Sequence, residues 1–203
     1  ASPVPVTLKT RLGPDHNNYT LSAVAAIAES LGIELITVHG RTRACRFNGQ
    51  AQFDEIAKVK SAFPHLAVIA NGDINSVVRA EAILHDTGCD GLMIGRSSVG
   101  NPWLFSQLRR RWTVDFQPLQ TLSKSDLMVA HIAEIHAFYG QAKGVRFARK
   151  HIQAYLQHLG LAAHFAALAT LSDAEQQLQQ LQALLAENAA GLDNIDNHSG
   201  VFA

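Results

Sequence analysis

Short hydrophobic runs alternate with amphipathic stretches between residues 5 and 96. The four runs span residues 5–8, 35–38, 67–70 and 91–94. They are continuously apolar, which is typical of parallel strands covered on both faces. Successive runs are roughly 24 to 32 residues apart, which fits repeated βα units. We therefore predict an α/β fold with four parallel strands.

The stretches between these runs carry hydrophobic residues at helical spacing. The first and third stretches end at Gly32 and Gly88, and glycine there can adopt the left-handed backbone that ends a helix. The second stretch begins at Phe53. Asn101 and Pro102 predict a fourth helix, with Asn101 as its N-cap and proline at its first position.

Beyond residue 111 the strand pattern stops and helical periodicity takes over. We expect a linker over 112–123 and a helical domain over 124–187, with a flexible tail over 188–203. The expected helices cover 125–139, 143–159, 162–171 and 172–187. Ser172 and Glu175 predict a capping box at the start of the last helix. Met93 and Met128 are expected in the hydrophobic core.

Composition narrows the class of protein. Hydrophobic residues make up 47% and charged residues 17% of the chain, which is ordinary for globular proteins. Apolar runs stay well short of the roughly 20 residues that span a bilayer, and the first residues lack a signal-peptide pattern. We therefore predict a cytoplasmic protein without a membrane segment. Cys45 and Cys89 lack the spacing of a metal site or a disulfide framework, so no metal is expected.

The net charge is zero, but the charges are unevenly distributed. Residues 104–160 contain eight Lys and Arg residues against three acidic residues. The basic residues are Arg109, Arg110, Arg111, Lys124, Lys143, Arg146, Arg149 and Lys150. This half of the chain could therefore face the phosphates of a nucleic acid.

Polar clusters follow or end each of the four predicted strands. They are Lys9-Thr10-Arg11, His39-Gly40-Arg41, Asn71-Gly72-Asp73 and Gly95-Arg96. The carboxyl ends of the strands meet at one end of a βα barrel, where ligands bind. Four clusters at the same height predict one shared ligand.

The residue types indicate what that ligand is. Gly72 and Gly95 allow close backbone approach and Arg96 adds positive charge, which together favour a phosphate group. Lys9 and His39 would lie over the barrel centre, where a cation suits an anionic reduced flavin. Other interpretations remain open. Lys9 could pair with an acid, His39 could be a hydrogen-bonded core residue, and the Asn71 cluster could be an ordinary turn.

The motifs resemble a known family. Residues 6–11, 37–42, 69–74, 93–96 and 101–105 resemble strands five to eight of the tRNA-dihydrouridine synthases and the segment that follows them. Residues 138–140, 143–151 and 155–156 resemble the helical domain of the bacterial B-type enzymes. The resemblance covers residues 3 to about 160.

The resemblance implies the second half of a TIM (β/α)₈ barrel followed by an all-α tRNA-binding domain. It implies FMN as cofactor, NADPH as reductant, and reduction of the C5–C6 bond of a tRNA uridine. It further implies that hydride would pass from flavin N5 to C6 and that a cysteine would donate a proton to C5. Lys9 and His39 would contact the flavin ring. The ribityl-phosphate would lie against Asn71, Gly72, Asp73, Gly95 and Arg96.

The resemblance also implies residues that contact the substrate. Arg11 would reach an extruded uracil, with Arg41 as a further substrate contact. The tRNA backbone would lie against Lys143, Arg146, Arg149 and Lys150, although a solvated helix face would give the same pattern.

We expect the first four strands and the proton-donating cysteine to lie outside this chain, so no catalytic residue is assigned and Cys45 is not that cysteine. Exposed half-barrel edges would then favour self-association. The alternatives are a tRNA-binding fragment without catalysis and another FMN-dependent barrel oxidoreductase.

Overall fold

The computed structural model describes residues 3–113 and 122–192. Parts of the predicted linker and tail, residues 114–121 and 193–203, lie outside the described residues. By its internal contacts the chain divides into a first unit, Ala1–Ser97, and a second unit, Ser98–Ala203. The sequence placed this boundary at residue 111. The helix that follows Asn101 therefore belongs, by contacts, with the second unit.

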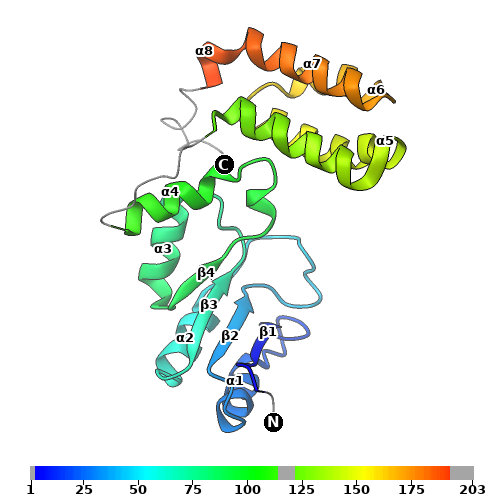
Figure 1. Ribbon diagram of the computed structural model, residues 1–203. Coiled ribbons are helices and arrows are strands. Elements are labelled where there is room, and N and C mark those ends of the chain that lie inside the picture. Colours follow the sequence, from blue (N-terminus) through cyan, green and yellow to red (C-terminus); the bar gives the residue numbers. More distant parts are fainter. Residues whose placement is uncertain (1–2, 114–121, 193–203) are drawn as a thin grey trace. The chain divides into compact units, whose positions relative to one another are not determined.

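The first unit is a parallel sheet whose strands lie in chain order, β1-β2-β3-β4 (Figure 1). Its strands are β1 (Thr7–Arg11), β2 (Leu35–His39), β3 (Ala67–Asn71) and β4 (Gly91–Met93). Its helices are α1 (Leu21–Ser30), α2 (Asp54–Ala62) and α3 (Val77–Thr87), and the short 3-10 helix η1 (Arg96–Ser98) follows β4. The predicted α/β fold with four parallel strands is confirmed.

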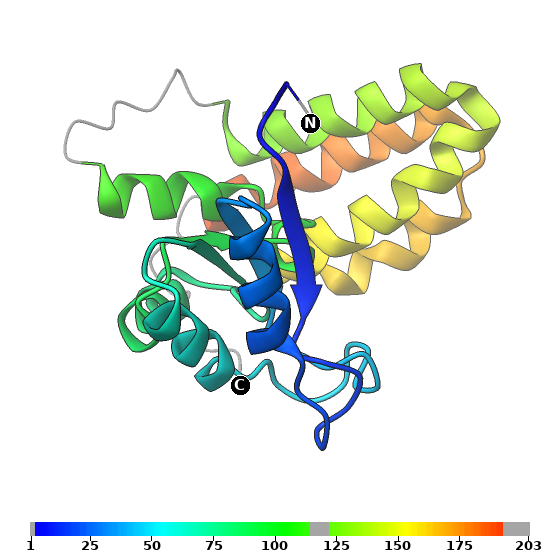
Figure 2. The same ribbon diagram turned by 90° about the horizontal axis from the view of Figure 1, so that it is seen from below.

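The two faces of this sheet differ. On one face, packed beneath the helices, Ile36, Val38, Val68 and Ala70 are fully buried (Figure 2). The other face carries two rows of residues in register. The first row is Lys9, Thr37, Ile69 and Gly91, and the second is Arg11, His39, Asn71 and Met93. The second row lies at the carboxyl ends of all four strands and is mostly polar.

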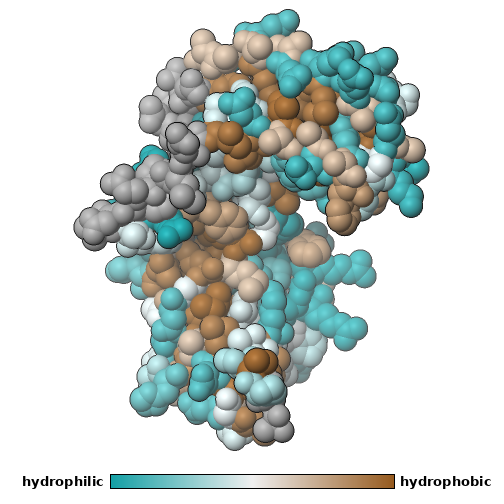
Figure 3. Space-filling model, in the orientation of Figure 1, coloured by the Kyte–Doolittle hydropathy of each residue, from teal (hydrophilic) through white to brown (hydrophobic). Residues whose placement is uncertain are grey.

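Two expectations for the strands are corrected. Strand β1 begins two residues later than predicted, so Lys9 and Arg11 lie within it and not beyond it. All five residues of β1 are exposed or half-buried, because β1 is an edge strand and its second face lacks a covering layer among the described residues. Met93 is 38% exposed on the other edge strand and is not a core residue, whereas Met128 is fully buried as expected. Figure 3 shows brown hydrophobic surface on the first unit between teal polar areas.

The second unit is helical. Its elements are α4 (Trp103–Trp112), α5 (Lys124–His158), η2 (Ala162–His164), α6 (Phe165–Thr170), α7 (Ala174–Glu187) and α8 (Ala189–Leu192). Helix α5 consists of two segments that meet at Gly140, whose φ of 75° and ψ of 168° suit only glycine. The predicted pair of helices on either side of this residue is therefore confirmed, and the sharp turn is visible in Figure 2.

Local sequence signals predicted one helix end correctly and placed two N-caps one residue too early. Gly88 adopts a φ of 63° and ends α3 as predicted. The N-cap of α4 is Pro102 and not Asn101. The N-cap of α7 is Asp173 and not Ser172, because the carboxylate of Asp173 accepts a hydrogen bond from the N–H of Gln176 at 2.9 Å.

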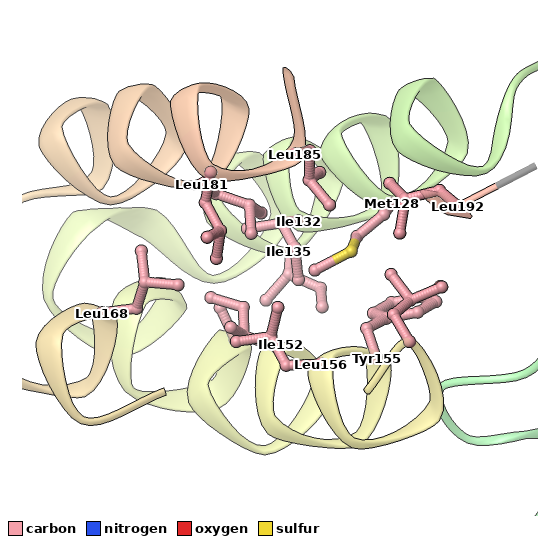
Figure 4. Packing of buried hydrophobic residues seen from close by; sticks show 13 residues of the cluster. Met128, Ile132, Ile135, Ile152, Tyr155, Leu156, Leu168, Leu181, Leu185 and Leu192 are labelled. Carbon is pink, nitrogen blue, oxygen red and sulfur yellow. The ribbon is translucent and has the colours of Figure 1, made fainter. Parts of the chain in front are cut away.

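The predicted tail is also corrected in part. Residues 189–192 form α8, and Leu192 is 3% exposed because it packs into the core of the second unit. That core lies between α5, α6, α7 and α8 (Figure 4). It contains Met128, Ile132, Ile135, Ala148, Ile152, Tyr155, Leu156, Leu159, Leu168, Leu181, Leu184, Leu185 and Leu192. The second unit is thus held together by an apolar centre.

Candidate functional site: a polar pocket at the carboxyl ends of the strands

A pocket of about 540 Å³ opens at the carboxyl ends of the strands of the first unit. Its lining includes all seven residues predicted to bind the cofactor, namely Lys9, His39, Asn71, Gly72, Asp73, Gly95 and Arg96. Arg11 also lines it. The structure therefore brings together residues that lie up to 87 positions apart, from Lys9 to Arg96 (96 − 9).

Lys9 and Asn71 form a hydrogen-bonded chain across the sheet. The ammonium of Lys9 donates to Asn71 Oδ1 at 3.2 Å, and Asn71 Nδ2 donates to the carbonyl of Met93 at 2.7 Å. Partial burial, followed by repulsion from Arg11, lowers the pKa of Lys9 from its ordinary value. These two hydrogen bonds hold the exposed amine of Lys9 at the pocket, where it can contact an anionic or carbonyl group of a ligand.

His39 is surrounded by cations. Burial, followed by repulsion from Arg11, Lys9, Arg41 and Arg96, lowers its pKa to about 4. Its Nε2 lies 3.4 Å from Nη1 of Arg41, and because arginine can only donate, Nε2 is the acceptor. At neutral pH the imidazole is therefore neutral and carries its proton on Nδ1.

Arg41 and Asp73 form an ion pair beneath the pocket. Nη2 of Arg41 donates to the two carboxylate oxygens of Asp73 at 2.9 and 2.7 Å, and the Ala51 N–H donates to Asp73 at 2.7 Å. Burial alone would raise the pKa of Asp73, but these hydrogen bonds and the nearby guanidinium groups outweigh burial and hold the pKa below its ordinary value. Arg41 also donates to the carbonyls of Asn48 and Gly49.

These bonds hold a strained turn. Asp73 has a φ of 46°, unusual for a residue other than glycine, and Gly72 has a φ of 123°. A Cβ at Gly72 would lie 2.8 Å from the Cβ of Ala51 and 3.2 Å from the His39 ring. The turn therefore requires glycine at position 72, while a Cβ at Gly95 would meet none of the described residues within 4 Å.

Phe47 is a pocket residue that the sequence analysis missed. It is 59% exposed, and its ring lies 5.6 Å from the guanidinium of Arg11 and 4.8 Å from that of Arg96. Arg11 also donates to the carbonyls of Thr42 and Arg46, which fixes the loop that carries Phe47. An aromatic residue in a basic loop is a sequence signal that could have marked Phe47 as a site residue. Its position beside Arg96, however, can be known only from the folded structure.

Of the six predicted substrate residues, Arg11 lines the pocket, and the other five fall into two groups. Lys143, Arg146 and Lys150 are exposed on the second segment of α5. Arg41, in contrast, is 4% exposed and engaged as described above. Arg149 is half-buried, and its Nη2 donates to the carbonyl of Leu171 at 3.0 Å. The structure therefore places Arg41 and Arg149 in positions that organise the protein and leaves the other three open to a partner.

Comparison with known proteins identifies the family. The sequence model described as "Dihydrouridine synthase (Dus)" matches residues 1–190. The chain therefore belongs to the dihydrouridine synthase family. It is 48% identical to tRNA-dihydrouridine synthase B of Klebsiella pneumoniae over 158 residues, covering 76% of this chain and 48% of that protein.

Two further relatives carry the same name. The chain is 44% identical over 180 residues to tRNA-dihydrouridine synthase B of Escherichia coli K12, covering 86% of this chain and 55% of that protein. The Serratia marcescens protein of the same name is 44% identical over 180 residues, covering 86% of this chain and 53% of that protein. The chain thus resembles B-type family members, as predicted, and spans about half of their length.

Across 3–113 and 122–192, the helices are all too short or too polar to cross a membrane. Within the same ranges, no three His, Cys, Asp or Glu side chains are grouped so that they could hold a metal ion.

Proposed function

We propose that this chain supplies part of the FMN site and the tRNA-binding helices of an enzyme that reduces tRNA uridine to 5,6-dihydrouridine with NADPH. The observation that carries the proposal is the pocket lined by all seven predicted cofactor residues. The names of the relatives, which share the family and cover most of this chain, support tRNA as the substrate. The cytoplasmic location stays a prediction.

The four-stranded sheet would be the second half of a (β/α)₈ barrel. Three observations support this: the strands are parallel and in chain order, helices bury one face, and the opposite face carries a polar row. In a closed barrel that row would point inward. We propose that the flavin-binding region lies within residues 1–111, with its pocket in the first unit, and that residues 112–123 are the linker. The proposed tRNA-binding domain begins at 124 and extends beyond 187 to include α8, which packs into its core.

The residues of the pocket fit a flavin mononucleotide. Gly95 leaves room for a phosphate, Gly72 allows the turn beside it, and Arg96 offers a guanidinium that is 62% exposed. Lys9 offers an exposed amine and His39 a neutral imidazole for the ring. Bound flavin would supply the hydride chemistry. The residues of this chain would bind and orient the cofactor, with Asn71 positioning Lys9 and Asp73 positioning Arg41.

Arg11, Lys143, Arg146 and Lys150 are proposed as tRNA contacts. Arg11 lines the pocket, which is where an extruded uracil would have to enter. For Arg41 we propose a positioning role because its guanidinium is buried against Asp73. Arg149 would likewise orient the segment of α5 that carries the exposed cations, through its bond to the carbonyl of Leu171.

Flavin titration tests the pocket. FMN fluorescence should be quenched on binding, and Lys9→Ala and Arg96→Ala should each weaken binding about tenfold, the usual loss for one charge-assisted contact. Lys58→Ala is the matched control, because Lys58 is exposed on α2 and paired with Glu55 outside the pocket. Equal affinity of all three variants for FMN would remove the site assignment.

Two alternatives remain distinguishable. A tRNA-binding fragment without catalysis would retain tRNA in a salt-sensitive manner. It would show no NADPH-dependent loss of uridine absorbance even after a polypeptide carrying the other half of the barrel is supplied in trans. Another FMN-dependent barrel oxidoreductase would bind FMN without retaining tRNA. The absence of acidic residues between Glu134 and Asp173 favours the tRNA enzyme over this second alternative. Self-association through the sheet edges stays a prediction that light scattering tests.

A further inference from the structure

The turn of α5 displays three aromatic side chains to solvent. Phe138 is 81% exposed, Phe147 51% and Tyr139 44%. The rings of Tyr139 and Phe147 are stacked with centroids 4.5 Å apart, and Phe138 meets Tyr139 edge-on at 4.8 Å. We call these three residues the aromatic apex. Such a group of exposed rings marks an interaction surface.

The apex rests on a rigid support. Gly144 packs so closely that a Cβ there would lie 2.7 Å from the Cα of His136, which brings the two segments of α5 together. Gly140 supplies the backbone that turns the chain between them. His136 is buried and bonded to Gln177 at 2.9 Å. Because the support is fixed, the rings are presented with little entropy left to lose on binding.

The surroundings of the apex are basic. Lys143, Arg146, Phe147 and Lys150 follow one another at helical spacing, so they share one exposed face of α5. Between Glu134 and Asp173 the sequence has no acidic residue. Among the described residues after Leu122, the exposed large hydrophobic side chains are all in the apex and all aromatic.

These features select one kind of partner. An aliphatic protein surface would be matched by leucine- or isoleucine-rich docking faces, whereas flat rings beside cations match a nucleobase beside its phosphates. We propose that the aromatic apex stacks against an unpaired base of tRNA, while Lys143, Arg146 and Lys150 hold the neighbouring phosphates. This inference rests on the proposed tRNA substrate and adds a base-stacking subsite to it.

Substitution of the rings tests the subsite. Phe138→Ala and Phe147→Ala should each weaken tRNA binding about tenfold, within the range of single stacking contacts. Phe147→Tyr, which keeps a ring, should bind like the parent. Phe105→Ala is the matched control, because Phe105 is 50% exposed on α4, outside the apex. Far-UV circular dichroism verifies that the variants remain folded.

Salt dependence separates stacking from phosphate contact. Phe138→Ala and Phe147→Ala should leave the slope of log affinity against log salt unchanged. Lys143→Ala or Arg146→Ala should reduce that slope by about 0.7 to 0.9. A fully paired RNA duplex should bind equally to the parent and the apex variants, since it offers no unpaired base.

The outcomes are distinct. If the parent binds tRNA and the apex variants bind it equally well, the stacking subsite is wrong and the proposed function stands. If the parent does not bind tRNA, the proposed tRNA interaction and the subsite both fail. If the variants lose self-association but keep tRNA binding, the apex is a protein contact and the inference is overturned.

Discussion

The two units of this protein use hydrophobic and charged residues in opposite ways. The first unit buries one sheet face and places an ion pair, Arg41 with Asp73, beneath its pocket. The second unit has a closed apolar core and carries its cations and exposed aromatic rings on α5, outside that core. In the first unit the residues that stabilise the fold also shape the site. In the second unit stability and proposed binding depend on different residues, so substitutions there should have separable effects. In the first unit we expect separable effects only at exposed positions such as Gly95.

The largest effect is expected from breaking the ion pair. Asp73→Ala would leave the buried guanidinium of Arg41 without its partner and should lower the unfolding free energy of the first unit by about 3–5 kcal/mol. It should also weaken FMN binding, because the Gly72 turn depends on the same carboxylate. Hydrogen exchange with mass spectrometry measures the loss unit by unit. Asp86→Ala, at a carboxylate that is 69% exposed, is the control. A loss of stability with unchanged flavin affinity would contradict the view that the same residues stabilise the first unit and shape its site.

A core truncation in the second unit should destabilise without touching the pocket. Leu181 is fully buried, so Leu181→Ala should lower the unfolding free energy of the second unit by about 3 kcal/mol. FMN affinity should stay at the parent value, because the pocket residues all belong to the first unit. Val78→Ala, at a position 73% exposed, is the control. Weaker FMN binding by Leu181→Ala would show that the two units are coupled.

Two glycines of the pocket should respond differently. Gly72→Ala combines a positive φ with contact against Ala51, and should cost about 1–3 kcal/mol of stability together with flavin affinity. Gly95→Ala meets open space among the described residues and should reduce flavin affinity with little change in stability. Thermal unfolding and FMN titration of both variants measure the difference. Equal stability losses would contradict the structural distinction.

The effect that should be smallest at neutral pH is a pH dependence from His39. Its pKa in the folded protein, about 4, lies below the ordinary value of about 6.5 in an unfolded chain. Between these values the unfolded state binds more protons, so stability is complete above about pH 6.5 and declines as the pH falls towards 4. NMR should show the His39 ring titrating near pH 4. His39→Asn should flatten this part of the stability profile, whereas His85→Asn, at an exposed position, should not.

Much of the fold was predictable because the signals are local. Continuous apolar runs gave the strands, and Gly88 gave the end of α3. The wrong predictions concern properties that depend on contacts between residues far apart in the sequence. Met93 is apolar, yet it lies on an edge strand and lines the pocket. Whether a position at the end of β4 is covered depends on what packs there, which the local pattern does not contain.

The site shows the same division. Residue types at strand ends predicted which side chains line the pocket, because parallel strands bring their carboxyl ends together. The burial of Arg41 was not predictable, since it depends on a carboxylate 32 positions later in the sequence. Phe47 was missed for the same reason, because its contact with Arg96 joins loops after two different strands.

The ion pair beneath the pocket also has a consequence for the order of folding. Arg41 and Ala51 flank the loop after β2, while Asp73 follows β3, so the contacts close only after these two strands have paired. Long-range contacts of this kind form late, since the chain between them must first be ordered. The pocket should therefore mature in a single late step. A newly made chain would acquire its binding geometry only after β3 has paired with β2. Before that step the pocket loops would not be ordered, so flavin should not bind.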